Sequence, residues 1–445
     1  MIRNNRLSAF AISSNRDRAG HIDGIILALI LAKEFILDFF GFGLFLNLFI
    51  CCLIFIRVFT VQWRIPLFAY IAIAAFPFLM LQAISMGGDF DVALKNIARL
   101  YQVGLYALFL LYLIIARPVY LRALYEKGFF LLNAILVLNI MAMVFQYLAP
   151  GVLVGASDGP QLMSEDVMSG LFGYASTHSV ALYTTFVIVY DVDTACRGVL
   201  NNRVLIPYVV VISLLSIYVA TLNDNKALFF FLPLGVFLCW VIYLAFNYKA
   251  SGVKTAIFIP LILCFLVLLV FSVPVLRSFV EDYITRSISM IVKAWDINAY
   301  VNGSDERFKI IPYSLSLATT WRFGDGFGLA DIYQMGYRGF NHFGQSDFGS
   351  LVIMGGAWFY LLVICFYTKL FTKYCSVASG KRRMLIIAII SLLVLSSAFT
   401  QVFTQVRIAI PLLMLCYAFR VYWLSASERQ EALEHLHQQS DNCNL

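Results

Sequence analysis

Apolar runs of about 15 to 21 residues alternate with short polar segments along most of the chain. A helix of this length crosses the hydrocarbon layer of a bilayer, and only helices or closed barrels satisfy every backbone group there. The pattern therefore predicts an all-α polytopic membrane protein with about twelve transmembrane helices. The expected spans are residues 24–40, 42–57, 65–84, 97–116, 129–149, 177–191, 204–222, 227–247, 255–274, 351–368, 384–399 and 407–424.

The expected spans divide the chain into five parts. Residues 1–23 form an N-terminal segment, 24–274 carry nine helices, 275–350 form a long extracytoplasmic loop, 351–424 carry three helices, and 425–445 form a tail. The long loop is rich in Ile, Tyr, Trp and Phe and has no low-complexity bias. We therefore expect the loop to be folded and partly helical.

Composition and charge agree with this topology. Hydrophobic residues make up 61% of the chain and charged residues 13%, which excludes an ordinary soluble domain. Twenty of the 32 Lys and Arg fall in segments expected in the cytoplasm, so both termini should be cytoplasmic. The net charge of +7 comes from basic residues scattered at the ends of apolar runs. We therefore expect the lipid bilayer, and no nucleic acid, as a partner.

The cysteines do not indicate a metal site or disulfides. Most of the nine lie inside apolar runs, and no pair has the spacing of zinc ligands. We expect buried thiols, and neither a metal nor another cofactor.

Charged residues inside an apolar run are costly in lipid, and the first expected span carries Lys33, Glu34 and Asp38. Local pairing against a neighbouring helix is the favoured interpretation of Lys33 and Glu34. A role in an intramembrane relay is the alternative.

Polar and ionisable residues concentrate at residues 304–356, late in the long loop. No predicted strand precedes the glycine-dense turn in this stretch, so we expect a turn with close backbone approach and not a dinucleotide-binding motif. Asp325 is expected to be a structural residue of that turn. The positions that stand out are Arg307, Gly324, Gly326, Gly328, His342, Gln345, Asp347, Gly355 and Gly356.

This stretch resembles the O-antigen polymerase and ligase superfamily of bacterial membrane glycosyltransferases. The shared pattern is an Arg that opens a loop helix, a Gly-x-Gly turn, a His, and a glycine-rich entry to a span. The best match covers roughly residues 170 to 370. In this chain the pattern corresponds to Arg307, Gly324-Asp325-Gly326, His342 and Met354-Gly355-Gly356.

The resemblance implies a GT-C-like fold and a metal-independent glycosyltransferase in the bacterial cytoplasmic membrane. Such enzymes use an undecaprenyl-diphosphate-linked glycan as donor, and they take the glycan from it on the outer face of the cytoplasmic membrane. A polymerase transfers it to another lipid-linked glycan during O-antigen, capsule or exopolysaccharide synthesis, and we favour this function. A ligase, which transfers it to lipid A core, is the alternative, and a flippase or transporter is an alternative of another class. A chain-length regulator and a flippase are candidate further partners.

The resemblance also implies roles for individual residues. Arg307 would bind the departing diphosphate, because fixed Arg donors stabilise developing negative charge. His342 would act as general base or orient the acceptor hydroxyl. Lys226 stands where the family often has the Arg of a Ser-Arg-Gly sequence, and it can neutralise phosphate as a point charge without the bidentate fork of an Arg. The further candidates for diphosphate or substrate binding are Arg286, Arg322, His178, Gln345 and Asp347.

Overall fold

The computed structural model describes a little over half of the chain. The described residues are 21–37, 43–60, 67–116, 118–149, 168–173, 176–197, 202–223, 225, 227–237 except 230, 309–316, 323–329, 346–375, 393–398, 400–405 and 407–411, with a few isolated positions besides.

Every regular element in these residues is a helix, as the sequence predicts. Residues 21–32, 393–397 and 407–411 are helical as well. The named elements are η1 (Lys33–Leu37), α2 (Gly43–Thr60), α3 (Leu67–Ser85), α4 (Phe90–Ala116), α5 (Pro118–Leu148), η3 (Gly170–Phe172), α6 (Thr177–Arg197), α7 (Asn202–Leu222), α12 (Ile310–Ser316), α14 (Asp347–Gly355) and α15 (Ala357–Cys375).

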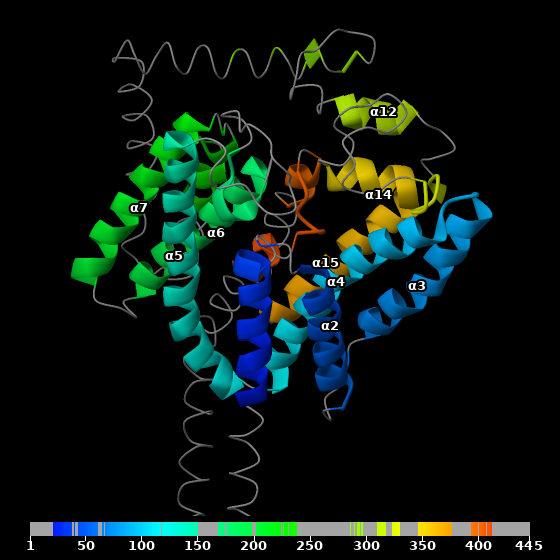
Figure 1. Cartoon of the computed structure of the whole chain (residues 1–445), viewed down its shortest axis with the longest axis horizontal. Helices are drawn as coiled ribbons and strands as arrows, with labels where there is room; N and C mark the ends of the chain where they lie inside the picture. The colour runs from blue at the N-terminus through cyan, green and yellow to red at the C-terminus, as the bar shows by residue number, and fades with distance from the viewer. Residues whose placement is uncertain are drawn as a thin grey trace, which may run out of the picture.

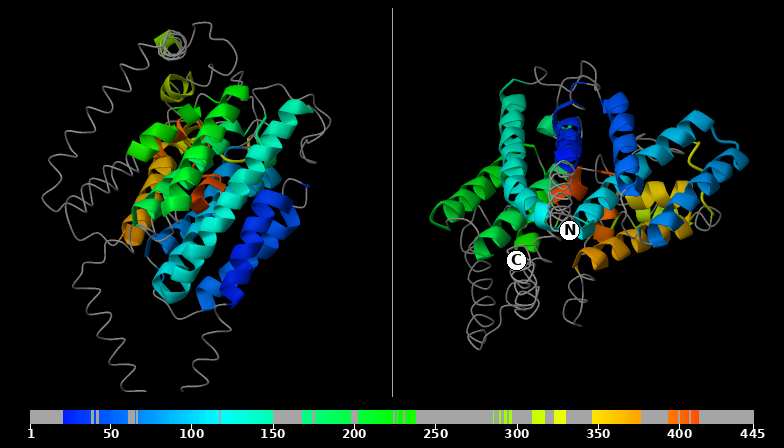
Figure 2. Two further views of the ribbon diagram at one scale, coloured as in Figure 1. Left: turned by 90° about the vertical axis from the view of Figure 1, so that its left-hand side faces the viewer. Right: turned by 90° about the horizontal axis from the view of Figure 1, so that it is seen from below.

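The helices form two groups. In one, α2, α3 and α15 pack on α4, and α14 packs on α15. In the other, α5, α6 and α7 pack on one another, with η3 against α5. Contact between α4 and α5 joins the groups, and Figure 1 shows α5 and α7 to the left of α3 and α4. The view from below in Figure 2 shows the same division.

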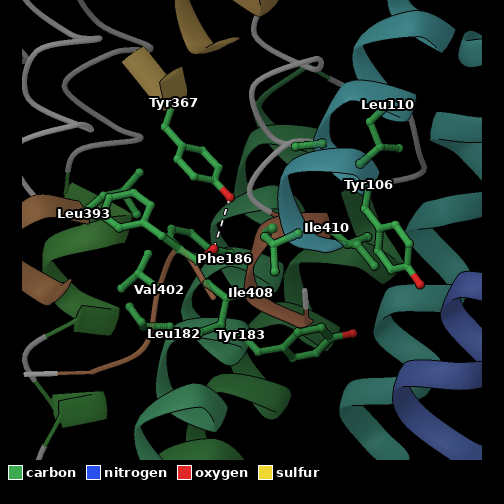
Figure 3. Packing of buried hydrophobic residues seen from close by; sticks show 14 of the residues in the cluster. Tyr106, Leu110, Leu182, Tyr183, Phe186, Tyr367, Leu393, Val402, Ile408 and Ile410 are labelled. Carbon is green, nitrogen blue, oxygen red and sulfur yellow. Dashed lines mark hydrogen bonds between the residues drawn. The ribbon is translucent and has the colours of Figure 1, made fainter. Parts of the chain in front are cut away.

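Aromatic side chains fill the centre where the two groups meet. Figure 3 shows Tyr367 of α15 and Phe186 of α6 beside Val402 and Ile408, while the hydroxyl of Tyr106 on α4 points away from them. The Tyr367 hydroxyl donates a hydrogen bond to a backbone carbonyl, that of residue 403, at 3.2 Å. The C-terminal segment 400–411 therefore lies inside the bundle, not at its edge.

Four helices in the described part are long and apolar enough to cross a membrane, against about twelve expected. They are Leu67–Ser85, Phe90–Leu113, Gly128–Leu148 and Arg203–Leu222.

Two features explain why the expected spans 177–191 and 351–368 are not among these four helices. Helix α6 carries Asp191, Asp193 and Arg197, which lower its hydropathy. The expected span 351–368 is broken at Gly356, where α14 ends and α15 begins. The expected spans 255–274 and 384–399 lie wholly or mostly outside the described residues.

Side-chain caps explain where two helices begin. The Asp89 carboxylate accepts hydrogen bonds from the backbone N–H groups of Asp91 and Val92, so it caps α4. Ser346 does the same for α14 by accepting from the N–H of Gly349 at 3.0 Å. The first cap contacts the glycine-dense turn, residues 323–329, because the N–H of Asp89 donates to the Gly328 carbonyl.

Candidate functional site

The glycine-dense turn, residues 323–329, caps the C-terminal end of α14. The backbone N–H of Asp325 donates to the Ile353 carbonyl at 2.7 Å, and that of Gly326 donates to the Met354 carbonyl at 2.9 Å. The last four carbonyls of a helix have no partner within the helix. The turn therefore satisfies two carbonyls that the break between α14 and α15 leaves free.

The other side of the same turn docks on α3 and α4. The backbone N–H of Asp89 donates to the Gly328 carbonyl at 2.9 Å. The Asn96 amide donates to the Phe327 carbonyl at 2.7 Å, and the Gln82 amide donates to the Phe323 carbonyl. These contacts join residues more than 200 positions apart in the sequence.

Only glycine fits two positions of this contact. Gly324 has a φ of 71°, and a Cβ there would lie 2.4 Å from the Met354 carbonyl oxygen. A Cβ on Gly328 would lie 2.7 Å from the Asp89 carbonyl oxygen. The prediction of a turn with close backbone approach is confirmed, and its physical reason is contact of backbone with backbone.

Asp347 holds the segment that follows residue 400. Its carboxylate accepts hydrogen bonds from the backbone N–H groups of Val402 and Phe403 and, at 2.6 Å, from the Thr404 hydroxyl. Burial raises the pKa of Asp347 to about 6, and the bonds from Thr404 and from the backbone oppose that rise. All three donors belong to the protein itself. They favour a positioning role for Asp347 over the predicted contact with sugar hydroxyls.

Arg407 connects two helix ends that are distant in the sequence. Its Nε donates to the Glu34 carbonyl at 2.7 Å, and Nη1 donates to the Phe172 carbonyl at 2.6 Å. Glu34 lies in η1, and Phe172 is the last residue of η3. A cation at the carbonyl end of a helix also interacts favourably with the helix dipole. The guanidinium lies over the Phe172 ring, 5.4 Å from its centroid.

A buried polar network surrounds the Glu34 side chain. Lys33 Nζ donates to Glu34 Oε1 at 2.8 Å, and the Gln102 amide donates to the same oxygen at 3.0 Å. The Asn47 amide donates to Gln102 at 2.7 Å, and the Tyr106 hydroxyl donates to Asn47 at 3.0 Å. The local pairing predicted for Lys33 and Glu34 is confirmed.

The turn after α7 reaches the segment that precedes α6. Asn223 donates through its amide to the Met168 carbonyl at 3.0 Å, and Asn225 donates to the Thr177 carbonyl at 2.7 Å. Thr177 is the first residue of α6, and the half-buried His178 follows it. This places His178, a candidate from the sequence, next to the contact between Asn225 and Thr177.

Most of the predicted site residues cannot be placed in this way. His178 and Asp347 are described, whereas Arg307, His342, Lys226, Arg286, Arg322 and Gln345 lie outside the described residues. Two parts of the resemblance motif do come together, because the Gly324–Gly326 turn bonds directly to the Met354–Gly356 stretch. That Arg307 and His342 lie together in one site stays a prediction.

Sequence reasoning missed the polar partners inside the bundle. Asn47 and Gln102 lie inside the expected spans 42–57 and 97–116, and Arg407 is the first residue of the expected span 407–424. The signal was an amide side chain within an otherwise apolar run, which needs a hydrogen-bond partner in the bundle. Which partner it meets depends on tertiary packing and is not readable from the sequence.

Within the part of the chain that the structure describes, no three His, Cys, Asp or Glu side chains gather closely enough to hold a metal ion. No family model matches the chain, and no curated protein matches it either. The resemblance to the O-antigen polymerase and ligase superfamily therefore stays a hypothesis that rests on the sequence motif.

Proposed function

We propose that the chain is an integral membrane glycosyltransferase that polymerises undecaprenyl-diphosphate-linked oligosaccharides. The reaction transfers the glycan from one lipid diphosphate to a sugar hydroxyl of a second lipid-linked glycan. It releases undecaprenyl diphosphate and takes place on the outer face of the bacterial cytoplasmic membrane. It uses no metal, because cationic side chains hold the leaving group.

The observation that carries this proposal is the direct bonding of two motif parts. The glycine turn and the Met354–Gly356 stretch are about 30 residues apart, and backbone hydrogen bonds from the turn to Met354 and to the preceding Ile353 make them one unit. That unit ends α14 and rests on the start of α4 through Asp89. In the sequence, Arg307 precedes this unit and His342 lies within its span. A rigid support at this point suits residues that must hold a diphosphate and a hydroxyl in fixed positions.

The chemical roles follow from residue type. The planar guanidinium of Arg307 binds the diphosphate oxygens in a bidentate manner as negative charge develops on them. The imidazole of His342 accepts the proton of the attacking hydroxyl near neutral pH. We further propose about twelve spans and a GT-C-like fold, with both termini in the cytoplasm.

Polymer formation from a defined lipid-linked donor tests the proposal in the purified full chain. Arg307→Lys keeps the charge and loses the planar fork, so the rate should fall on the order of a hundredfold. His342→Ala should lose most activity near pH 7 and recover part of it at alkaline pH. Wild-type rates in both variants, at normal accumulation, would contradict the proposed site.

Two further experiments test compartment and reaction class. Reporter fusions at residues 158, 226 and 303 should report the outside, and fusions at 122 and 381 the cytoplasm. In a deletion strain, single lipid-linked repeat units indicate a lost polymerase. Full-length lipid-linked chains left unattached indicate the alternative function, a ligase. Transport of the lipid-linked glycan by the purified protein would instead favour a flippase.

A further inference from the structure

The turn after α7 presents two buried amide side chains whose orientation is fixed. Asn223 is 1% exposed and Asn225 is 4% exposed. Each uses its amide N–H to donate to a backbone carbonyl, that of Met168 or Thr177. Because a carbonyl accepts and never donates, the NH2 group must face it in both cases. The oxygen of each amide therefore points to the other side.

Neither amide oxygen receives a hydrogen bond from the part of the chain that the structure describes. Oδ1 of Asn223 and Oδ1 of Asn225 are both buried and lack a donor. A buried acceptor left in this state costs about 1 to 3 kcal/mol, and native proteins keep few of them. Two such oxygens on one turn form a pair of acceptors that a bound ligand can use.

The surroundings of these oxygens are held from several sides. On α5, Gln146 accepts from the N–H of Gly170 and Asn139 accepts from the N–H of Leu171, both at 2.8 Å. Arg407 donates to Phe172 at the end of the same segment. The segment 168–173 is thus anchored by α5, by Arg407 and by the Asn223 amide. The two asparagine side chains are therefore fixed through their NH2 groups, against this segment and against the start of α6.

We propose that Asn223 and Asn225 form a glycan-binding subsite, in which their amide oxygens accept hydrogen bonds from sugar hydroxyl groups. An amide oxygen is a neutral acceptor, so it suits a hydroxyl donor and cannot bind a diphosphate, which has no proton to donate. This inference rests on the proposed function and adds to it. The diphosphate would be held by cations, and the sugar would be recognised here.

The test compares two probes on the purified full chain: an undecaprenyl-diphosphate-linked oligosaccharide and undecaprenyl diphosphate without sugar. The wild type should bind the glycosylated lipid more tightly. Asn223→Ala and Asn225→Ala should each lower that preference roughly fivefold to tenfold, the equivalent of one net hydrogen bond. Asn139→Ala is the matched control. It also loosens the 168–173 segment, but its amide oxygen already accepts from Leu171.

Each outcome decides the matter differently. If the wild type binds both lipids equally, the subsite is overturned and the proposed function stands. If neither lipid binds, the proposed function is overturned, and the subsite falls with it. If the Asn223 and Asn225 variants keep the same preference as Asn139→Ala, the oxygens hold structural water and the subsite is overturned.

A measurement on the wild type keeps the inference testable if the variants do not accumulate. Hydrogen exchange of residues 219–229 should be slower with the glycosylated lipid than with the bare lipid diphosphate. Equal exchange with both probes would overturn the subsite.

Discussion

Two polar turns pack against helix ends in this protein, and their hydrogen bonding differs. The glycine turn, residues 323–329, gives its backbone groups to α14 and takes donors from Asp89 and Asn96. The asparagine turn, residues 223–225, donates to neighbouring carbonyls but leaves both amide oxygens without a donor in the described chain. The first turn is complete as a support. The second keeps two buried acceptors, which the proposed subsite assigns to sugar hydroxyl groups.

The difference follows from which atoms carry the contact. In the glycine turn, backbone meets backbone, and the absence of a Cβ at Gly324 allows the approach. In the asparagine turn, side chains make the contact, and each amide carries a donor and an acceptor on opposite sides. One side anchors the turn, and the other faces away. Whether a polar turn can bind a ligand is thus better indicated by its acceptors that lack a donor than by its polar composition.

The largest effect should come from filling the glycine turn. Gly324→Ala places a Cβ 2.4 Å from the Met354 carbonyl oxygen at a φ of 71°. We expect a loss of about 3 kcal/mol or more in folding stability, from overpacking and backbone strain together. Thermal unfolding of the detergent-purified protein measures this.

Gly87→Ala is the matched control for that substitution. Gly87 has a φ of 75°, but nothing lies within 4 Å of the position that a Cβ would take there. Gly87→Ala should therefore lower folding stability only by the cost of backbone strain, about 1 kcal/mol. Equal losses in the two variants would contradict the account of backbone contact.

The next effect concerns Asp347, at the end of α14 opposite the glycine turn. Its folded-state pKa of about 6 lies above the ordinary value of 3.8, so the folded protein binds this proton more tightly than the unfolded chain. Stability should therefore rise as the pH falls through 6, by about 2 kcal/mol between pH 8 and pH 4.

Asp347→Asn removes that titration and provides the comparison. The variant should lack the part of the pH dependence that belongs to residue 347, while all other titrating groups stay the same. The measurement is unfolding stability of both proteins between pH 4 and pH 8. Parallel curves would show that Asp347 does not titrate in this range.

The smallest effect should come from the asparagine turn. Asn225→Ala loses the bond to Thr177 but also removes a buried oxygen that has no donor, so stability should change by less than about 1 kcal/mol. Asn96→Ala is the control. It lies on α4, and its loss leaves the Phe327 carbonyl of the glycine turn without its donor, so folding stability should fall by about 1 to 3 kcal/mol. A larger loss at Asn225 than at Asn96 would reverse the comparison.

Local features of this structure were predictable from the sequence, and long-range ones were not. The glycine spacing predicted a close-packed turn, and adjacent Lys33 and Glu34 predicted local pairing. Hydropathy counts apolar residues without regard to helix breaks, so it did not predict the end of α14 at Gly356. The third partner of Glu34, Arg407, lies 373 residues away, and no local pattern connects the two.

That separation between Glu34 and Arg407 has a consequence for how the protein is made. Ribosomes add about 5 to 20 residues per second, so Arg407 is synthesised about 20 to 75 s after Glu34. During this interval the carbonyls of Glu34 and Phe172 have no guanidinium to cap them. The Glu34 and Phe172 carbonyls therefore lack this donor until the segment that carries Arg407 has been made and has packed against them. A chain truncated just before residue 407 should be the form that quality-control proteases recognise.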